Sequence, residues 1–226
     1  MVNEKLVLVF DVNETLLDLR ALDAPFEQVF GDAAVRSQWF QQLLQNALVS
    51  TATDNYADFG AIGRAALQMV AARRGHELSE DATALILGTV RRLPPHSEVR
   101  EALERLRDAG FRLSTLTNST EAVARAQLEN AELAHFFERI LSADTLRRLK
   151  PASEPYHMAA RDLGVDVGEV CLVAAHAWDV AGALRAGCQA AFVARPGMVL
   201  DPLAPEPDVI GNDLTDVTER LLDISH

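Results

Sequence analysis

The sequence predicts an α/β fold with a Rossmann-like parallel-sheet core and an inserted helical cap domain. Three observations lead to this prediction: short continuous apolar runs, helix-like stretches between them, and one long block without any strand pattern. The chain has 226 residues, enough for one sizeable core that carries a smaller lobe. Its 49% hydrophobic and 24% charged residues are the ordinary balance of a globular protein.

The first apolar run, at residues 6–10, is continuous rather than alternating, which is typical of a strand buried on both faces. The block that follows it has only helical patterns. We expect its helices at residues 21–30, 33–52, 59–74 and 80–92. Pro94 and Pro95 then mark the return to the core. We therefore expect a core domain of residues 1–18 and 94–226 and a cap domain of residues 19–93.

After the cap, helix and strand patterns alternate. Apolar runs recur at residues 111–116, 170–174 and 191–194. Helix-like stretches cover residues 98–109, 120–130 and 155–163. Gly110 and Gly164 follow the first and last of these stretches, as expected at helix ends. Strands alternating with helices indicate βαβ units and a mostly parallel sheet.

The chain is acidic, with 21 Lys+Arg against 33 Asp+Glu and a formal net charge of −12. Its basic residues stand mostly singly or in pairs, so we expect no nucleic-acid partner and no membrane partner. The run at residues 6–10 is too short for a signal-peptide core or a membrane span. Cys171 and Cys188 are expected to be buried thiols, with a disulfide between them as the alternative. We expect a cytoplasmic protein.

Candidate site residues follow the expected strands, because open parallel sheets bind ligands beyond the carboxyl ends of their strands. Asp11 follows the first strand, and a carboxylate at such a tip stays ionised and is a competent nucleophile. A neighbouring Lys150 would keep Asp11 charged, and Asp179 would hold that lysine. Asn118 follows another strand. Each residue also has a simpler interpretation, as a loop or helix cap or, for Lys150, as a surface side chain.

Four segments, taken in order and in their strand context, resemble the four motifs of the haloacid dehalogenase superfamily. They are residues 10–16, 116–119, 149–151 and 177–179. The resemblance covers essentially the whole chain, including the helical cap between the first two motifs. Most members of that superfamily are magnesium-dependent phosphatases. They carry a second aspartate two residues after the nucleophile, where this chain has Asn13.

The closer resemblance is to the type II (S)-2-haloacid dehalogenases, which use neither a metal nor another cofactor. It implies a metal-independent hydrolase that displaces a leaving group at C2 of a small carboxylic acid. Asp11 would attack the carbon and form an aspartyl ester that water hydrolyses. Lys150 would keep Asp11 charged, and Asp179 would hold Lys150. Thr15 and Asn118 would orient the Asp11 carboxylate.

The resemblance also implies a set of substrate-binding residues. They are Thr117, Asn13, Tyr156, Trp178, Phe40, Trp39 and Phe59. Thr117 and Tyr156 would contact the substrate carboxylate, and Trp178, Trp39 and Phe59 would form an apolar wall. The subgroup carries an arginine after the cap tryptophan that helps to hold the leaving halide, where this chain has Phe40. It has Ser-Ser-Asn where this chain has residues 174–176, which end in His176.

These departures leave the leaving group open. Hydrolases that open the ring of azetidine-2-carboxylate resemble these dehalogenases, and their amine leaving group needs a proton instead of an anion site. His176 is a candidate catalytic residue in both interpretations, as a base for water or, with Asn13 or Glu14, in proton transfer. A neutral His176 bonded to the backbone is the simpler alternative. A magnesium-dependent phosphatase and a catalytically silent binding protein are further alternatives. The expected partners are a small carboxylate and water, and the resemblance is compatible with a homodimer.

Overall fold

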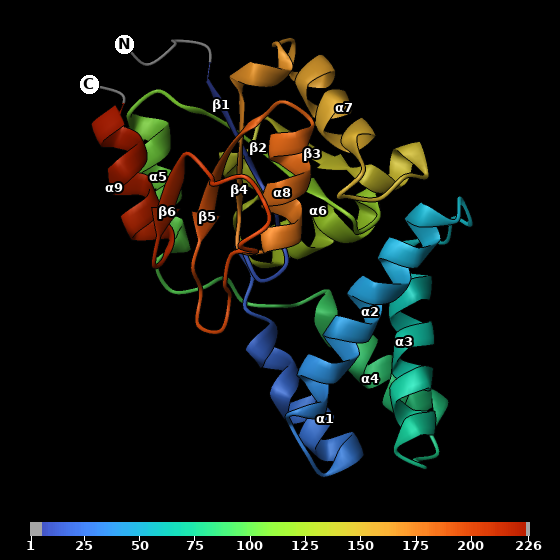
Figure 1. Cartoon of the computed structure of the whole chain (residues 1–226). Helices are drawn as coiled ribbons and strands as arrows, with labels where there is room; N and C mark the ends of the chain where they lie inside the picture. Colours follow the sequence, from blue (N-terminus) through green and yellow to red (C-terminus); the bar gives the residue numbers. More distant parts are fainter. Residues whose placement is uncertain (1–5, 225–226) are drawn as a thin grey trace.

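The computed structural model describes residues 6–224 of the chain, and its centre is a six-stranded parallel sheet in the order β3-β2-β1-β4-β5-β6 (Figure 1). The strands are β1 (Val7–Phe10), β2 (Arg112–Thr117), β3 (Arg139–Ser142), β4 (Val170–Ala174), β5 (Gln189–Val193) and β6 (Val209–Gly211). The expected α/β class and parallel sheet are confirmed. Because β1 lies between β2 and β4, Asp11 extends from the middle of the sheet.

Helices cover both faces of this sheet. They are α5 (Val99–Asp108), α6 (Glu121–Asn130), α7 (Ser153–Leu163), α8 (Ala177–Arg185) and α9 (Leu214–Ile224). Successive β1 side chains point to opposite faces, as in any strand. Leu8 and Phe10 pack in the cluster that holds the apolar side chains of α5 and α9. Val7 and Val9 pack with those of α7 and α8, which explains why the β1 run is continuously apolar.

Four helices lie together below the sheet in Figure 1, with α2 beside α3. They are α1 (Asp23–Phe30), α2 (Val35–Ala52), α3 (Phe59–Arg73) and α4 (Glu80–Val90). The segment that leads from the sheet to these helices and the segment that returns to the sheet lie side by side. The Asp18 N–H donates to the Pro94 carbonyl over 2.8 Å, and the His96 N–H donates to the Leu16 carbonyl over 3.0 Å. The exact division into core and cap domains stays a prediction.

Most expected elements agree with the structure to within two residues. The helix expected over residues 21–30 instead divides into a 3₁₀ turn at Leu19–Leu22 and helix α1. Strands β3 and β6 are not evident in the sequence, since they are short edge strands of four and three residues. Among the described residues, no helix is both long and apolar enough to cross a membrane.

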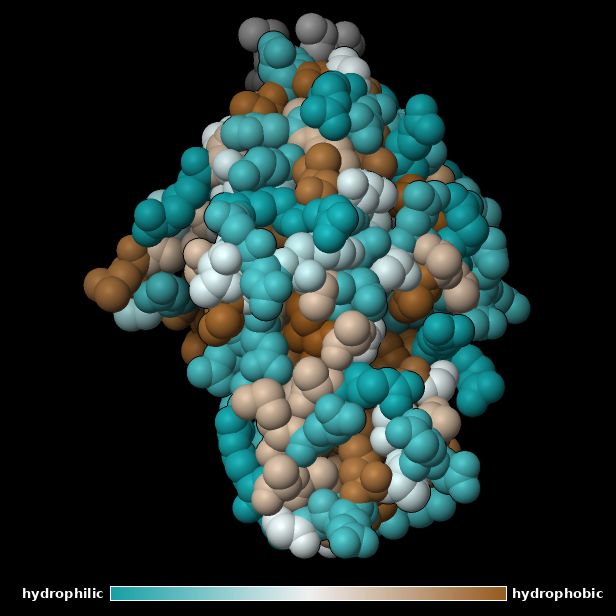
Figure 2. Space-filling model, turned by 90° about the vertical axis from the view of Figure 1, so that its right-hand side faces the viewer, coloured by the Kyte–Doolittle hydropathy of each residue, from teal (hydrophilic) through white to brown (hydrophobic). Residues whose placement is uncertain are grey.

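The surface view in Figure 2 shows a largely hydrophilic face on which hydrophobic residues gather where the sheet region meets the four lower helices. Cavities lie at this junction, next to the carboxyl ends of the strands. The candidate residues at the strand ends therefore face this junction.

Candidate active site

Asp11 continues β1 beyond its last residue, because its backbone N–H donates to the Val173 carbonyl over 3.0 Å. Its side chain is only 7% exposed. Lys150 Nζ donates to Asp11 Oδ1 over 3.0 Å, and Thr15 Oγ1 donates to Oδ2 over 2.9 Å. The Ala175 N–H donates in turn to Thr15 Oγ1 over 3.0 Å, which fixes the direction of the threonine hydroxyl.

Lys150 lies between two carboxylates and has no exposed side-chain surface. Its ammonium group donates to Asp11, to Asp179 Oδ2 over 2.5 Å and to the Leu116 carbonyl over 2.7 Å. These three bonds use all three N–H donors of the ammonium. Burial disfavours the charged form of Lys150, but the two carboxylates outweigh that effect and raise its pKa.

The pKa values of the two carboxylates that flank Lys150 shift in opposite directions. Burial opposes ionisation of Asp11, but the Lys150 charge and the neighbouring His176 together outweigh this effect and lower the Asp11 pKa. Burial raises the pKa of Asp179, which lies deeper and also faces the Asp11 charge. Asp11 is therefore the carboxylate that stays ionised and available for attack.

Tyr156 holds Asp179 from the far side, since its hydroxyl donates to Asp179 Oδ1 over 2.6 Å. The tyrosine is 1% exposed and does not line the cavity beside Asp11. The expected contact with a substrate carboxylate stays a prediction, and the hydroxyl is bonded to Asp179 instead in this structure. Burial and the neighbouring Asp179 raise the pKa of Tyr156, so its hydroxyl stays protonated as the donor.

Asn118 contacts the backbone of Lys150. Its side-chain oxygen accepts from the Lys150 N–H over 2.8 Å, and its amide group donates to the Lys150 carbonyl over 3.2 Å. No bond from Asn118 to Asp11 is present among the described residues. Asn118 thus orients Asp11 only indirectly, because both hydrogen bonds of its side chain hold the loop that supplies Lys150.

The cavity beside Asp11, called here the catalytic cavity, is small, with a volume of about 10 Å³. It is lined by Asp11, Asn13, Phe40, Leu44, Phe59, Thr117, Asn118, Lys150, His176 and Trp178. Of the expected substrate-binding residues, Tyr156 and Trp39 lie outside this lining. Trp39 instead packs between α2 and α3, where its Nε1 donates to the Gly63 carbonyl over 2.9 Å. Leu44 lines the cavity but was not expected from the sequence.

His176 is 6% exposed and lies in the catalytic cavity, with its Nδ1 3.4 Å from Asp11 Oδ2. Its ring lies 5.7 Å from that of Phe40 and 5.4 Å from that of Trp178, between centroids. Neither of its ring nitrogens has a well-aligned hydrogen-bond partner within the described part of the chain, nor has Trp178 Nε1. The simpler interpretation of His176 as a residue bonded to the backbone is therefore wrong.

Arg195 supports the nucleophile loop and was missed in the sequence. Its guanidinium is buried and donates to the Thr15 carbonyl over 2.7 Å and to Glu98 over 2.6 Å. The available signal was its position two residues after β5, at the same edge of the sheet as Asp11. Glu14 does not line the catalytic cavity. It faces another cavity, where it lies 3.8 Å from Arg36.

A magnesium ion, as used by the phosphatase branch, does not fit this set of residues. The Lys150 ammonium occupies the position between the Asp11 and Asp179 carboxylates that a cation shared by them would need. The second Asp179 oxygen accepts from Tyr156. A hard cation needs several free oxygen ligands, and these carboxylates are already bonded to ammonium and hydroxyl donors.

The fold and this arrangement define a hydrolase with a buried aspartate nucleophile. Residues 6–187 match the sequence model of the haloacid dehalogenase-like hydrolase family, and the chain belongs to this family. The family expected from the four motifs is thereby confirmed.

Several relatives of this chain are (S)-2-haloacid dehalogenases. The chain is 32% identical to (S)-2-haloacid dehalogenase 4A of Burkholderia cepacia, over 87% of this chain and 86% of that protein. It is 28% identical to (S)-2-haloacid dehalogenase 2 of Pseudomonas sp. (strain CBS-3), over 95% and 94%. The structure of L-2-haloacid dehalogenase from Xanthobacter autotrophicus with chloropropionic acid covalently bound has a TM-score of 0.89 and 25% identity, covering 96% of this chain and 98% of that one. The azetidine alternative finds no support among these relatives.

Proposed function

We propose that this protein hydrolyses the carbon–halogen bond of (S)-2-haloacids through an ester of Asp11. The observation that carries the proposal is the buried Asp11 carboxylate, which Lys150 and Thr15 hold at the wall of the catalytic cavity. The relatives support the substrate class, and one of them was solved with chloropropionic acid covalently bound. Water and a small carboxylate are the partners that this chemistry requires.

In the first step, an Asp11 carboxylate oxygen attacks C2 from the side opposite the halogen. A C–O bond forms while the C–halogen bond breaks, and the electron pair leaves with the halide. The lowered Asp11 pKa supports this role, because a protonated carboxyl group is a poor nucleophile. Lys150 holds the carboxylate while its own donors remain bonded to Asp11, Asp179 and the Leu116 carbonyl. We assign Tyr156 a positioning role, through its hydrogen bond to Asp179.

In the second step, water attacks the Asp11 carboxyl carbon and the ester bond to that carbon breaks. We assign His176 the removal of the first water proton. Its place in the catalytic cavity, with Nδ1 3.4 Å from Asp11 Oδ2, and the lack of a well-aligned partner for its ring among residues 6–224 support this role. His176 returns that proton to the leaving oxygen of the 2-hydroxy acid, the second water proton is released to solvent, and the configuration at C2 is inverted. The water oxygen stays in the Asp11 carboxylate, and the net products are a hydroxy acid, a halide and a proton.

The departing halide needs donors other than a cap arginine, because Phe40 carries no charge. Trp178 lines the catalytic cavity, and its buried indole N–H has no hydrogen-bond partner among the described residues. The Lys150 ammonium lies 5.9 Å from the Trp178 ring centroid and adds positive potential beside it. We propose that this indole N–H donates to the leaving halide.

Isotope transfer tests the ester mechanism. (S)-2-Chloropropionate is turned over in water enriched in ¹⁸O, with chloride release measured alongside mass spectrometry of the peptide that contains Asp11. Under single turnover the product oxygen should come from unlabelled Asp11, and the label should appear in the protein. Label found in the product and absent from Asp11 after one turnover would instead indicate direct attack by water. Asp11→Asn, assayed before any deamidation, should release no chloride.

Two further features belong to this proposal. We infer a cytoplasmic location, which the two free and buried thiols, Cys171 and Cys188, support. A homodimer remains a prediction, and sedimentation of the purified protein measures it directly.

A further inference from the structure

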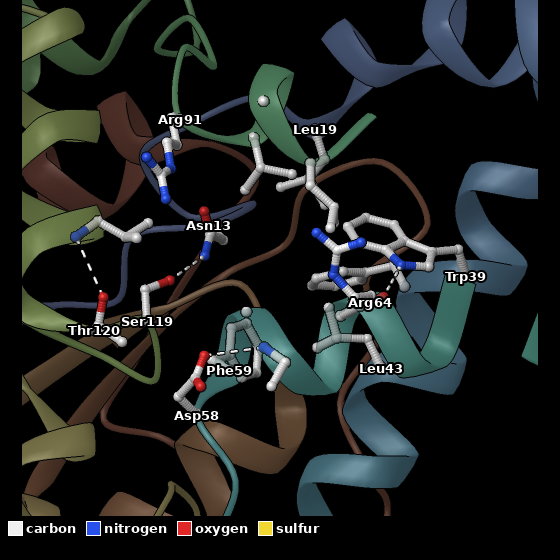
Figure 3. Close-up of a pocket in the computed structure, with 18 of the residues that line it drawn as sticks. Asn13, Leu19, Trp39, Leu43, Asp58, Phe59, Arg64, Arg91, Ser119 and Thr120 are labelled. Atoms are coloured by element: carbon white, nitrogen blue, oxygen red, sulfur yellow. Dashed lines mark hydrogen bonds between the residues drawn. The ribbon is translucent and has the colours of Figure 1, made fainter. Parts of the chain in front are cut away.

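A second cavity adjoins the catalytic cavity, and Figure 3 shows it between α2, α3 and α4 on one side and the start of α6 on the other. We call it the cap chamber, and its volume is about 470 Å³. Asn13, Phe40 and Phe59 line both cavities, so the two spaces meet at these side chains. The cap chamber therefore lies next to the nucleophile without containing it.

The walls of the cap chamber are mainly apolar. They include Leu19, Trp39, Leu43, Leu87, Val90 and Val123. Polar side chains also line the chamber. Trp39 Nε1 donates to the Gly63 carbonyl and Asn13 Oδ1 accepts from Gln127, while Asp58, Arg64, Arg91, Ser119 and Thr120 add charged and hydroxyl groups to the lining (Figure 3). The apolar part of this surface favours an apolar group of a ligand, because burial of apolar groups is favourable, and the Arg64 and Arg91 guanidinium groups add positive charge that suits an anionic ligand.

Size separates the roles of the two cavities. The catalytic cavity, of about 10 Å³, has the capacity of about one water-sized probe, whereas the cap chamber is far larger. A 2-haloacid with a methyl group at C2 is larger than one water and extends beyond the catalytic cavity, but it would leave most of the cap chamber unfilled. Gly88 also leaves space there, since a Cβ atom added to it would have no atom within 4 Å.

We propose that the cap chamber receives a long alkyl group carried on C2, so that the preferred substrates are medium-chain 2-haloacids. This inference rests on the proposed function and names its substrate class. Each buried methylene strengthens binding by about fourfold, so a chain of several methylenes in the chamber dominates affinity. The alkyl group on C2 would pass between Asn13 and Phe59 while C2 faces Asp11.

Two substitutions on α4 test the chamber directly. Gly88→Leu places a side chain into the open space, and Ala84→Leu does so from another position in the chamber wall. Asp81→Leu is the matched control, because it adds the same side chain to the same helix at an exposed position outside the chamber. Circular dichroism and thermal unfolding confirm that each variant is folded.

The probes are octanoate and propionate, which carry no halogen, and their dissociation constants are measured by calorimetry. The wild-type protein should bind octanoate at least about tenfold more tightly than propionate. Gly88→Leu and Ala84→Leu should bring this ratio close to one, and Asp81→Leu should keep it. A wild-type ratio near one, or a ratio that both chamber variants leave unchanged, overturns the inference.

Turnover of 2-bromooctanoate and 2-bromopropionate separates this inference from the proposed function. If neither releases bromide while the octanoate preference responds to Gly88→Leu, the chamber stands and the proposed reaction fails. If 2-bromopropionate is hydrolysed and 2-bromooctanoate has no higher kcat/KM, the reaction stands and the chamber proposal fails. If both proposals hold, 2-bromooctanoate has a higher kcat/KM than 2-bromopropionate, and Gly88→Leu abolishes this difference.

Discussion

Gly182 is the position where one added methyl group should disturb the charged site most clearly. It lies in α8, three residues after Asp179, and packs against Pro151 and Tyr156. A Cβ atom at this position would lie 2.6 Å from Pro151 Cβ, 2.6 Å from the Tyr156 hydroxyl oxygen and 2.9 Å from the Pro151 carbonyl oxygen. Ordinary contacts between carbon atoms are about 3.5–4.0 Å, so Gly182→Ala forces a movement of about 1 Å.

The expected cost follows from these contacts. Overpacking of a buried site typically costs about 1–3 kcal/mol, whereas replacing glycine by alanine within a helix returns up to about 1 kcal/mol. We expect Gly182→Ala to lower the free energy of unfolding by about 1–2 kcal/mol. It should also lower kcat, because the Tyr156 hydroxyl is displaced from Asp179, which holds Lys150.

The assay is urea unfolding followed by circular dichroism, together with halide release. Gly88→Ala is the matched control, since this glycine also lies inside a helix but has free space at its Cβ position. The control should raise the free energy of unfolding by about 0.5–1 kcal/mol. If Gly182→Ala were as stable as wild type and fully active, the reasoning from close contact would be refuted.

The other predictions concern the charges around the nucleophile. Lys150→Met should lower stability by about 3–5 kcal/mol in urea unfolding, because it leaves two buried carboxylates without a counter-charge; unchanged stability would contradict this. His176→Asn should slow ester hydrolysis by about a hundredfold or more, so that the Asp11 ester accumulates and is detected by mass spectrometry. Since the folded-state pKa of Asp11 is lowered, its contribution to stability is complete above its unfolded value of about 3.9 and is lost as pH falls through the lower folded value. The rate of ester formation, measured in single turnover, should therefore not fall through Asp11 protonation between about pH 5 and 8. If the rate fell within this range in both the wild-type protein and His176→Asn, the low Asp11 pKa would be contradicted.

The sequence was most informative where structure depends on neighbours along the chain. Apolar runs predicted β1, β2, β4 and β5, because a strand covered on both faces needs continuous apolar side chains. The edge strands β3 and β6 carry a weaker pattern, since they are partly exposed and include residues such as Arg139 and Ser142. Their pairing depends on residues far away in the sequence.

For the site, the sequence by itself determined which chemical groups follow the strands and in what order. It predicted Asp11, Lys150 and Asp179 as a charged set, because the carboxyl ends of parallel strands meet at one edge of the sheet. Only the tertiary structure decided the partner of each group. Asn118 holds the Lys150 backbone, Tyr156 holds Asp179, and His176 lies beside Asp11.

The sizes of the two cavities were likewise decided by the tertiary structure. They depend on how α2, α3 and α4 pack over the strand ends, and a gap between packed helices leaves no periodic pattern in the residues around it. Local side-chain chemistry is encoded position by position. Distances between groups far apart in the chain, such as Lys150 and Asp11, exist only once the sheet and its helices are assembled.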